Sequence, residues 1–147
     1  MKTWWGLLVF FVIFSFGLSA QEAEYDPALY AVGSLSAGNL YLSYLVLGTV
    51  ADGYAQGLYD ATVATSIVSE TIFLNSNAQT SLVELLEQGN LSDEDLGVIA
   101  NINRVYDLLT NQGEALIRFI SDPEDTGDLF QQNREAAWVE ISSLLGF

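Results

Sequence analysis

The chain has 147 residues, with 19 Asp and Glu against 4 Lys and Arg, a formal net charge of -15, no cysteine and no histidine. Without cysteine or histidine it can form no disulfide, no Cys/His zinc site, no haem axial histidine and no Ser–His or Cys–His catalytic pair. The excess of acids argues against nucleic-acid binding, because contacts with phosphates need clustered lysine and arginine. The length suits a single domain.

The first 20 residues have the parts of a secretory signal peptide. Lys2 supplies a positive charge, residues 4–16 are almost wholly apolar, and small residues end the leader at Ala20. Cleavage there leaves residues 21–147 as one domain, with three arginines against 19 acids. An uncleaved anchor is the alternative, since residues 4–20 are at the lower limit of length for a membrane span. We therefore expect a periplasmic or secreted protein of a bacterial cell envelope, stabilised by its core rather than by disulfides.

The segment from Asp26 to Asp60 predicts a first helix that is apolar on nearly all sides. Between those two residues the only charge is Asp52. Such a helix is a buried central helix, an oligomer interface or a membrane span over residues 29–51. Residues 57–60 (Gly-Leu-Tyr-Asp) then predict a helix stop, a short link and the N-cap of the next helix. Small residues that form one side of the first helix are Gly33, Ala37, Gly48, Ala51 and Ala55.

A second helix is predicted from about Asp60 to Gln88. Asn75 lies beside its inner face, and we interpret this residue as a polar group with a partner on a neighbouring helix rather than as a ligand contact. The residues that helical spacing assigns to the inner face are Ala64, Ile67, Thr71, Leu74, Ala78, Leu82 and Leu85.

The third helix has the clearest signals. Ser92 is its N-cap, residues 93–95 are acids in the first turn, where the helix dipole favours them, and the helix is expected to end near Asp122-Pro123. The apolar stripe that recurs at helical spacing comprises Ile99, Ile102, Tyr106, Leu109, Leu116 and Ile120. The polar residues on the opposite face are Arg104, Asp107, Asn111, Glu114 and Arg118.

A fourth, shorter helix is predicted from about Gly127 to Leu145. Four helices joined by short links predict an all-α fold, a small antiparallel four-helix bundle (up-down-up-down) after the signal peptide. Because the fourth helix is shorter than the others, one end of the bundle is expected to stay open. The residues that the fourth helix is expected to bury are Phe130, Ala137, Ile141, Leu144 and Leu145.

No residues of this chain are assigned to catalysis, to a metal or to a cofactor. Residues 122–128 place oxygens at alternate positions as a calcium loop does, but the twelfth position, which should be Glu, is Asn133. An acidic link containing a helix N-cap explains the same pattern, although calcium binding there stays open. Asp52 and Glu70 lie on different predicted helices and are expected to be solvated rather than to form an acid–base pair, so an enzyme that uses carboxylates alone is the last alternative. We therefore predict that the protein is not an enzyme.

The possible ligand or interaction residues are Tyr41, Tyr44 and Arg134. The tyrosines combine apolar area with a polar tip, and Arg134 projects from the apolar stripe of the fourth helix, where it must reach solvent or find a carboxylate. We expect a non-enzymatic binding or envelope accessory protein, with a protein partner or self-association and without nucleic acid. One alternative is a bundle whose apolar pocket uses Arg134 to bind a small carboxylate. Another is a membrane-anchored hairpin of residues 4–20 and 29–51, in contact with the membrane only if the leader is uncleaved.

Overall fold

The computed structural model describes residues 26–87, 91–122 and 124–146, and these ranges contain helices and links but no strand. The predicted all-α class with four helices is therefore confirmed for the described residues. The predicted leader, residues 1–20, lies outside them. The four helices are α1 Pro27–Ala55, α2 Ala61–Glu87, α3 Asp93–Ser121 and α4 Asp128–Leu145.

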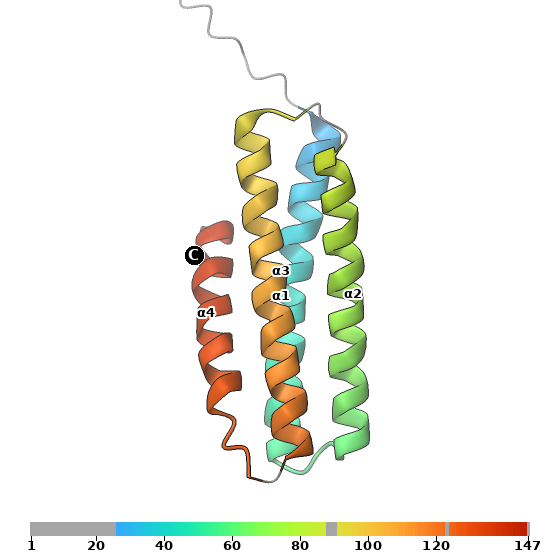
Figure 1. Ribbon diagram of the computed structural model, residues 1–147, viewed down its shortest axis with the longest axis vertical. Helices are drawn as coiled ribbons and strands as arrows, with labels where there is room; N and C mark the ends of the chain where they lie inside the picture. The colour runs from blue at the N-terminus through green and yellow to red at the C-terminus, as the bar shows by residue number, and fades with distance from the viewer. Residues whose placement is uncertain (1–25, 88–90, 123, 147) are drawn as a thin grey trace, which may run out of the picture.

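Helix α3 is the centre of the bundle. Both α1 and α3 pack against the other three helices, but α3 has the more extensive contacts with α2 and α4, which are not in contact with each other along their described residues. In Figure 1 the chain passes down α1, returns along α2, passes down α3 and returns along α4, with α2 and α4 on opposite sides of α3. This central position explains why the apolar stripe of α3 is buried from Ile99 to Ile120.

The ends of α1 and the start of α2 follow from short-range chemistry. Asp26 caps α1, because its Oδ1 accepts hydrogen bonds from the backbone amides of Ala28 at 2.8 Å and Leu29 at 3.3 Å. After α1, Gly57 adopts a φ of 70°, a conformation that few residues other than glycine enter. Asp60 then caps α2 by accepting from the amide of Val63 at 2.8 Å. The predicted stop, link and N-cap are confirmed.

The boundaries of α3 and α4 also agree with the sequence. Ser92 accepts a hydrogen bond from the amide of Asp95 at 3.2 Å, and the Asp95 carboxylate accepts from the amide of Ser92, which completes a capping box. Helix α3 ends at Ser121, and α4 begins after Gly127, whose φ is 76°. Helix α4 has 18 residues, whereas the other three have 27 to 29, so it is shorter as predicted.

The buried side chains of α1 and α3 are concentrated toward one end of the bundle. In α1 they begin only at Leu40 and in α3 at Ile99. At the far end of both helices, the Tyr54 hydroxyl donates to the backbone oxygen of Ile120 at 3.1 Å, and its ring meets the ring of Phe119 edge-on at 5.8 Å. We call this the packed end: it contains the α1–α2 and α3–α4 links.

Two predictions about helix faces need correction. Leu74 was assigned to the inner face of α2, but its side chain is 51% exposed, and Val68 and Asn75 are buried instead. Asn75 shares the buried face with Ala64, Val68 and Leu82, which lie at helical spacing, and the hydroxyl of Ser43 on α1 donates to Asn75 Oδ1 at 2.7 Å. The predicted partner for Asn75 on a neighbouring helix is thus confirmed.

Helix α1 is not buried on all sides as its composition predicted. Leu35 is 75% exposed and Leu42 is 61% exposed, because α2, α3 and α4 together cover only part of its circumference. Elsewhere the predicted faces hold: the six apolar residues of the α3 stripe are buried, as are Phe130, Ala137 and Ile141 of α4. Among the described helices, none has the length and hydropathy needed to cross a membrane.

Candidate functional site

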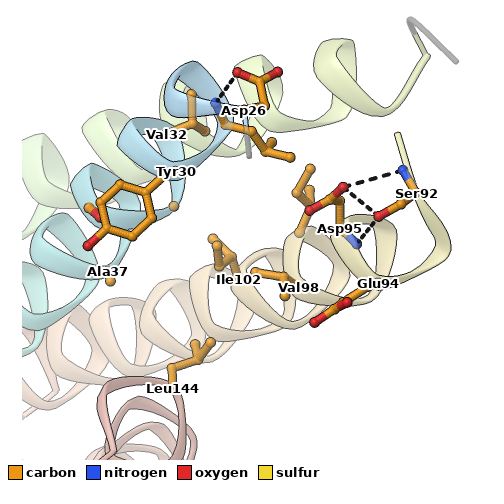
Figure 2. A pocket seen from close by; sticks show the side chains of 14 residues that line it. Asp26, Tyr30, Val32, Ala37, Ser92, Glu94, Asp95, Val98, Ile102 and Leu144 are labelled. Carbon is orange, nitrogen blue, oxygen red and sulfur yellow. Dashed lines mark hydrogen bonds between the residues drawn. The ribbon is translucent and has the colours of Figure 1, made fainter. Parts of the chain in front are cut away.

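A cavity of about 530 Å³ opens between the first turns of α1 and α3. Its walls come from residues 26–37 of α1, residues 92–102 of α3, and Leu144 in the last turn of α4. It therefore lies away from the packed end and next to the C-terminus of the short helix α4. We call this end of the bundle the hollow end, and we call the space the terminal cavity. Figure 2 shows Ile102 and Val98 on the α3 side of the opening and Leu144 on α4 below them.

The lining of the terminal cavity combines an apolar wall with polar groups. This is the usual composition of a small-molecule site, where apolar side chains supply contact area and a few polar groups fix orientation. None of the three arginines lines the cavity. The apolar residues that line it are Leu29, Val32, Ala37, Val98, Ile99, Ile102 and Leu144, and the polar ones are Asp26, Tyr30, Ser34, Ser92, Glu94 and Asp95.

Two of the acids at the cavity are held in place by the helix caps. Asp26 uses Oδ1 for both of its capping hydrogen bonds, and Asp95 uses Oδ2 for its bonds with Ser92. Figure 2 shows Asp26 at the start of α1 and Asp95 on the facing side of the opening. Each of these carboxylates thus has a fixed position and a second oxygen that bonds to none of the described residues.

Gly33 gives the terminal cavity part of its width. A Cβ atom at this position would meet no heavy atom within 4 Å. Because the neighbouring residues of α1 keep the helix regular, a side chain introduced here would project into empty space rather than displace the fold. Gly33 is therefore a position at which the cavity can be filled.

A second hollow, of about 510 Å³, lies along α1 beside α2. Exposed Leu35 and Leu42 stand on either side of Gly38, and the floor includes buried Tyr106 of α3. The Tyr106 hydroxyl donates to Asn39 Oδ1 at 3.0 Å. Burial raises the pKa of Tyr106, and a side-chain hydrogen bond with Ser36 opposes that rise.

The structure brings two of the three sequence-predicted site residues together. The Arg134 guanidinium carbon lies 5.9 Å from the centre of the Tyr44 ring, and the Trp138 ring lies 5.4 Å from the same ring. Arg134 also covers the bare backbone of Gly48, where a Cβ atom would come within 3.1 Å of Arg134 Nη2. Tyr41 is half-buried against the core.

Of the two courses expected for Arg134, pairing with a carboxylate is not found among the described residues. Arg134 is half-buried, and among the described residues it forms no ion pair, whereas Arg104 pairs with Glu140. The Tyr44 ring provides the favourable surface that a carboxylate would have supplied. Neither the terminal cavity nor the second hollow is lined by Tyr41, Tyr44 or Arg134.

The acidic link between α3 and α4 is shaped by its own side chains. Asp122 Oδ1 accepts from the amide of Glu124 at 3.0 Å, and Asp125 Oδ1 accepts from the amide of Gly127 at 2.7 Å. Over the part of the chain that the structure describes, no group of three or more acids is placed to hold a metal ion. These hydrogen bonds give the acidic link a structural role in reversing the chain.

Sequence reasoning did not find the residues of the terminal cavity. The only signal was the shortness of the fourth helix, which predicted an open end without saying which side chains face it. A periodic pattern marks which residues face inward, but not whether a neighbouring helix extends far enough to cover them. Comparisons with protein-family models, curated proteins and solved structures find no match to this chain.

Proposed function

We propose that this protein is an exported, non-enzymatic binding protein of the bacterial cell envelope, which holds a small apolar molecule in the terminal cavity. The observation that carries the proposal is the cavity itself: about 530 Å³ of space with a largely apolar wall at one end of a bundle whose other end is packed. The absence of histidine and cysteine from the sequence supports a role in binding rather than catalysis.

The export part of the proposal depends on the leader. We propose that residues 1–20 are removed and that residues 21–147 act as one antiparallel up-down-up-down domain in the periplasm or outside the cell. Expression of the full chain in a bacterial host, followed by a native mass spectrum of the envelope fraction, measures this directly. A mass that begins at Gln21 is the expected result, and a full-length mass would contradict it and favour the anchored hairpin.

The binding part is tested by filling the cavity. Gly33→Phe places a ring in the terminal cavity. Gly38→Phe is a matched control, because Gly38 lies on the same helix and its Cβ position also has no heavy atom within 4 Å, but it lines the second hollow instead. Isothermal titration with decyl maltoside, an uncharged amphiphile, below its micelle-forming concentration is the measurement. We expect binding to the native protein and to Gly38→Phe, and its loss in Gly33→Phe. Equal binding to all three proteins would contradict a site in the terminal cavity.

Self-association is a second candidate function, favoured by the exposed face of α1. Leu35 and Leu42 are largely exposed, and no charged residue occurs between Pro27 and Ala51. Copies of such an acidic chain repel one another, so an interface between two copies needs a face without carboxylates. Sedimentation velocity is the measurement. We expect a dimer that becomes more stable when salt is added and less stable in Leu42→Gln, whereas the control Leu74→Gln on α2 leaves it unchanged. A monomer at every concentration would exclude this candidate.

A ligand site at Tyr41, Tyr44 and Arg134 stays a prediction. To bind a carboxylate, Arg134 would have to leave the Tyr44 ring and uncover Gly48, which it now covers. Arg134→Ala therefore distinguishes the two roles: loss of stability with binding of the neutral amphiphile intact is expected for a packing residue, whereas a stable fold that no longer retains a ligand would restore the arginine pocket.

A further inference from the structure

The rim of the terminal cavity carries charge of one sign only. Three carboxylates, those of Asp26, Glu94 and Asp95, line the cavity, and it has no lysine or arginine among its lining residues. Resting on the proposed function, we infer that the ligand is a cationic amphiphile, an apolar body that carries an ammonium-type head. The carboxylates favour a positive head, and the apolar wall favours the body.

The helix ends around the cavity do not reverse this preference. The N-terminus of a helix binds anions when its first amides are free. Here the amides of Ala28 and Leu29 in α1 already donate to Asp26, and the amide of Asp95 in α3 donates to the Ser92 hydroxyl. The amides of Asp93 and Glu94 are not used in the caps, but an anionic head that reached them would approach the carboxylates of Glu94 and Asp95, which line the cavity.

The two capping carboxylates are well placed for a cation. Asp26 and Asp95 stand on facing sides of the opening, as Figure 2 shows, and each is oriented by hydrogen bonds to one of its oxygens. The other oxygen, Oδ2 of Asp26 and Oδ1 of Asp95, bonds to none of the described residues. Since the caps have already fixed these side chains, little conformational entropy remains to be lost when a cation binds.

The apolar wall behind the rim would bind the apolar body of the ligand. Val32 of α1, Val98 and Ile102 of α3 and Leu144 of α4 approach the same space from three helices. These side chains are branched hydrocarbons that offer no hydrogen bond, so they select an apolar chain or ring system. The order of the two parts is fixed by geometry, because the carboxylates belong to the first turns of α1 and α3, whereas Ile102 lies deeper along α3.

Three probes with the same decyl chain test the inference on the purified protein. They are decyltrimethylammonium, decyl maltoside and decyl sulfate, each titrated below its micelle-forming concentration. We expect the cation to bind about tenfold more tightly than the neutral probe, as one favourable charge interaction near a protein surface allows, and the anion to bind most weakly. Added salt is expected to weaken binding of the cation and to leave the neutral probe nearly unchanged.

A pair of double variants separates the rim from the overall charge of the protein. Asp26→Asn with Asp95→Asn removes two charges at the cavity and keeps side chains that can cap the helices. Asp52→Asn with Glu70→Gln removes two charges from exposed positions that do not line the cavity. We expect the first pair to abolish the tenfold preference and the second pair to retain it. Glu94→Gln, whose side chain makes no hydrogen bond to a described residue, gives the same test if the first pair impairs folding.

The outcomes distinguish this inference from the proposed function. Equal binding of the three probes, or an equal loss of preference in both double variants, would overturn the cationic ligand and leave a cavity for apolar molecules. If no probe binds and Gly33→Phe changes nothing, the proposed function itself fails. Preference for the cation that is lost only in the rim variants supports both.

Discussion

The two ends of the bundle use the same kind of helix in different ways. At the packed end, Leu47 and Leu116 are fully buried, and Tyr54 ties the last turn of α1 to α3. At the hollow end, the first turns of α1 bury no residue, and apolar side chains such as Val98 line a cavity instead. The difference follows from one length, that of α4, whose 18 residues cover only part of α1 and α3. A bundle can thus form a binding space by shortening one helix, without any change in the chemistry of the others.

The largest expected effect is a difference between two leucines of α1. Leu47→Ala removes a fully buried side chain at the packed end and should lower the free energy of unfolding by about 2–5 kcal/mol. Leu29→Ala, at the half-buried wall of the cavity, should lower it by about 1 kcal/mol because less apolar area is lost. Urea denaturation measures both. Equal losses would mean that the ends are packed alike.

Alanine substitutions at two glycines of α1 should change the free energy of unfolding in opposite directions. At Gly53 a Cβ atom would come within 2.5 Å of the Tyr59 ring, so Gly53→Ala should lower the free energy of unfolding by about 1–3 kcal/mol. At Gly33 there is open space, and Gly33→Ala should raise it by about 0.5–1 kcal/mol through helix propensity. Thermal melts of the two variants check the signs. Stabilisation by both would show that Tyr59 yields easily and that the packed end is looser than described.

An effect of similar size is expected for the buried polar pair between α1 and α2. Ser43→Ala leaves Asn75 Oδ1 buried without its hydrogen bond, which should lower the free energy of unfolding by about 1–3 kcal/mol. Combining it with Asn75→Leu should recover much of that loss, because no polar group then remains unpaired. Chemical denaturation of the single and double variants measures the coupling. Additive losses would contradict a direct interaction between the two side chains.

The smallest expected change in the free energy of unfolding concerns Tyr106. Its hydroxyl donates to Asn39, which lies next to Leu40, where burial in α1 begins. Because burial raises the pKa of Tyr106 above its ordinary value of 10.0, the folded state holds the proton more tightly than the unfolded state. Stability should be complete below pH 10 and fall as the pH rises through the folded-state pKa, by at most about 1.4 kcal/mol per pH unit. Tyr106→Phe should reduce the fall measured between pH 9 and pH 11. An unchanged pH dependence would place the titration elsewhere.

The fold could be predicted from local signals, because helix ends are determined locally. Asp60 and Ser92 each cap the helix that the sequence assigned to them, and the α3 stripe is buried as its spacing requires. Face assignments were less reliable where spacing allowed two answers. Leu74 and Asn75 are neighbours, and Asn75 turns inward because it is in register with buried Val68 and Leu82, with its side-chain oxygen bonded to Ser43.

The candidate site was harder to predict because it exists only where no neighbouring helix covers the apolar side chains of α1 and α3. Ile102 is buried as its spacing predicts, yet it also lines the cavity, and Val98 beside it stays exposed because α4 ends before it could cover this part of α3. Arg134 shows the converse difficulty: the sequence reveals a cation on an apolar stripe, but the surface it covers belongs to Tyr44 and Gly48 on another helix. Neither neighbour can be read from the spacing of α4 alone.

The contact between Arg134 and Gly48 also has an evolutionary consequence. A Cβ atom at position 48 would lie only 3.1 Å from Arg134 Nη2, so a larger residue there can be accommodated only if the guanidinium moves away from the α1 backbone. Each increase in size at position 48 therefore shifts Arg134 further from its present place, and a substitution at one position changes which side chains the other can tolerate.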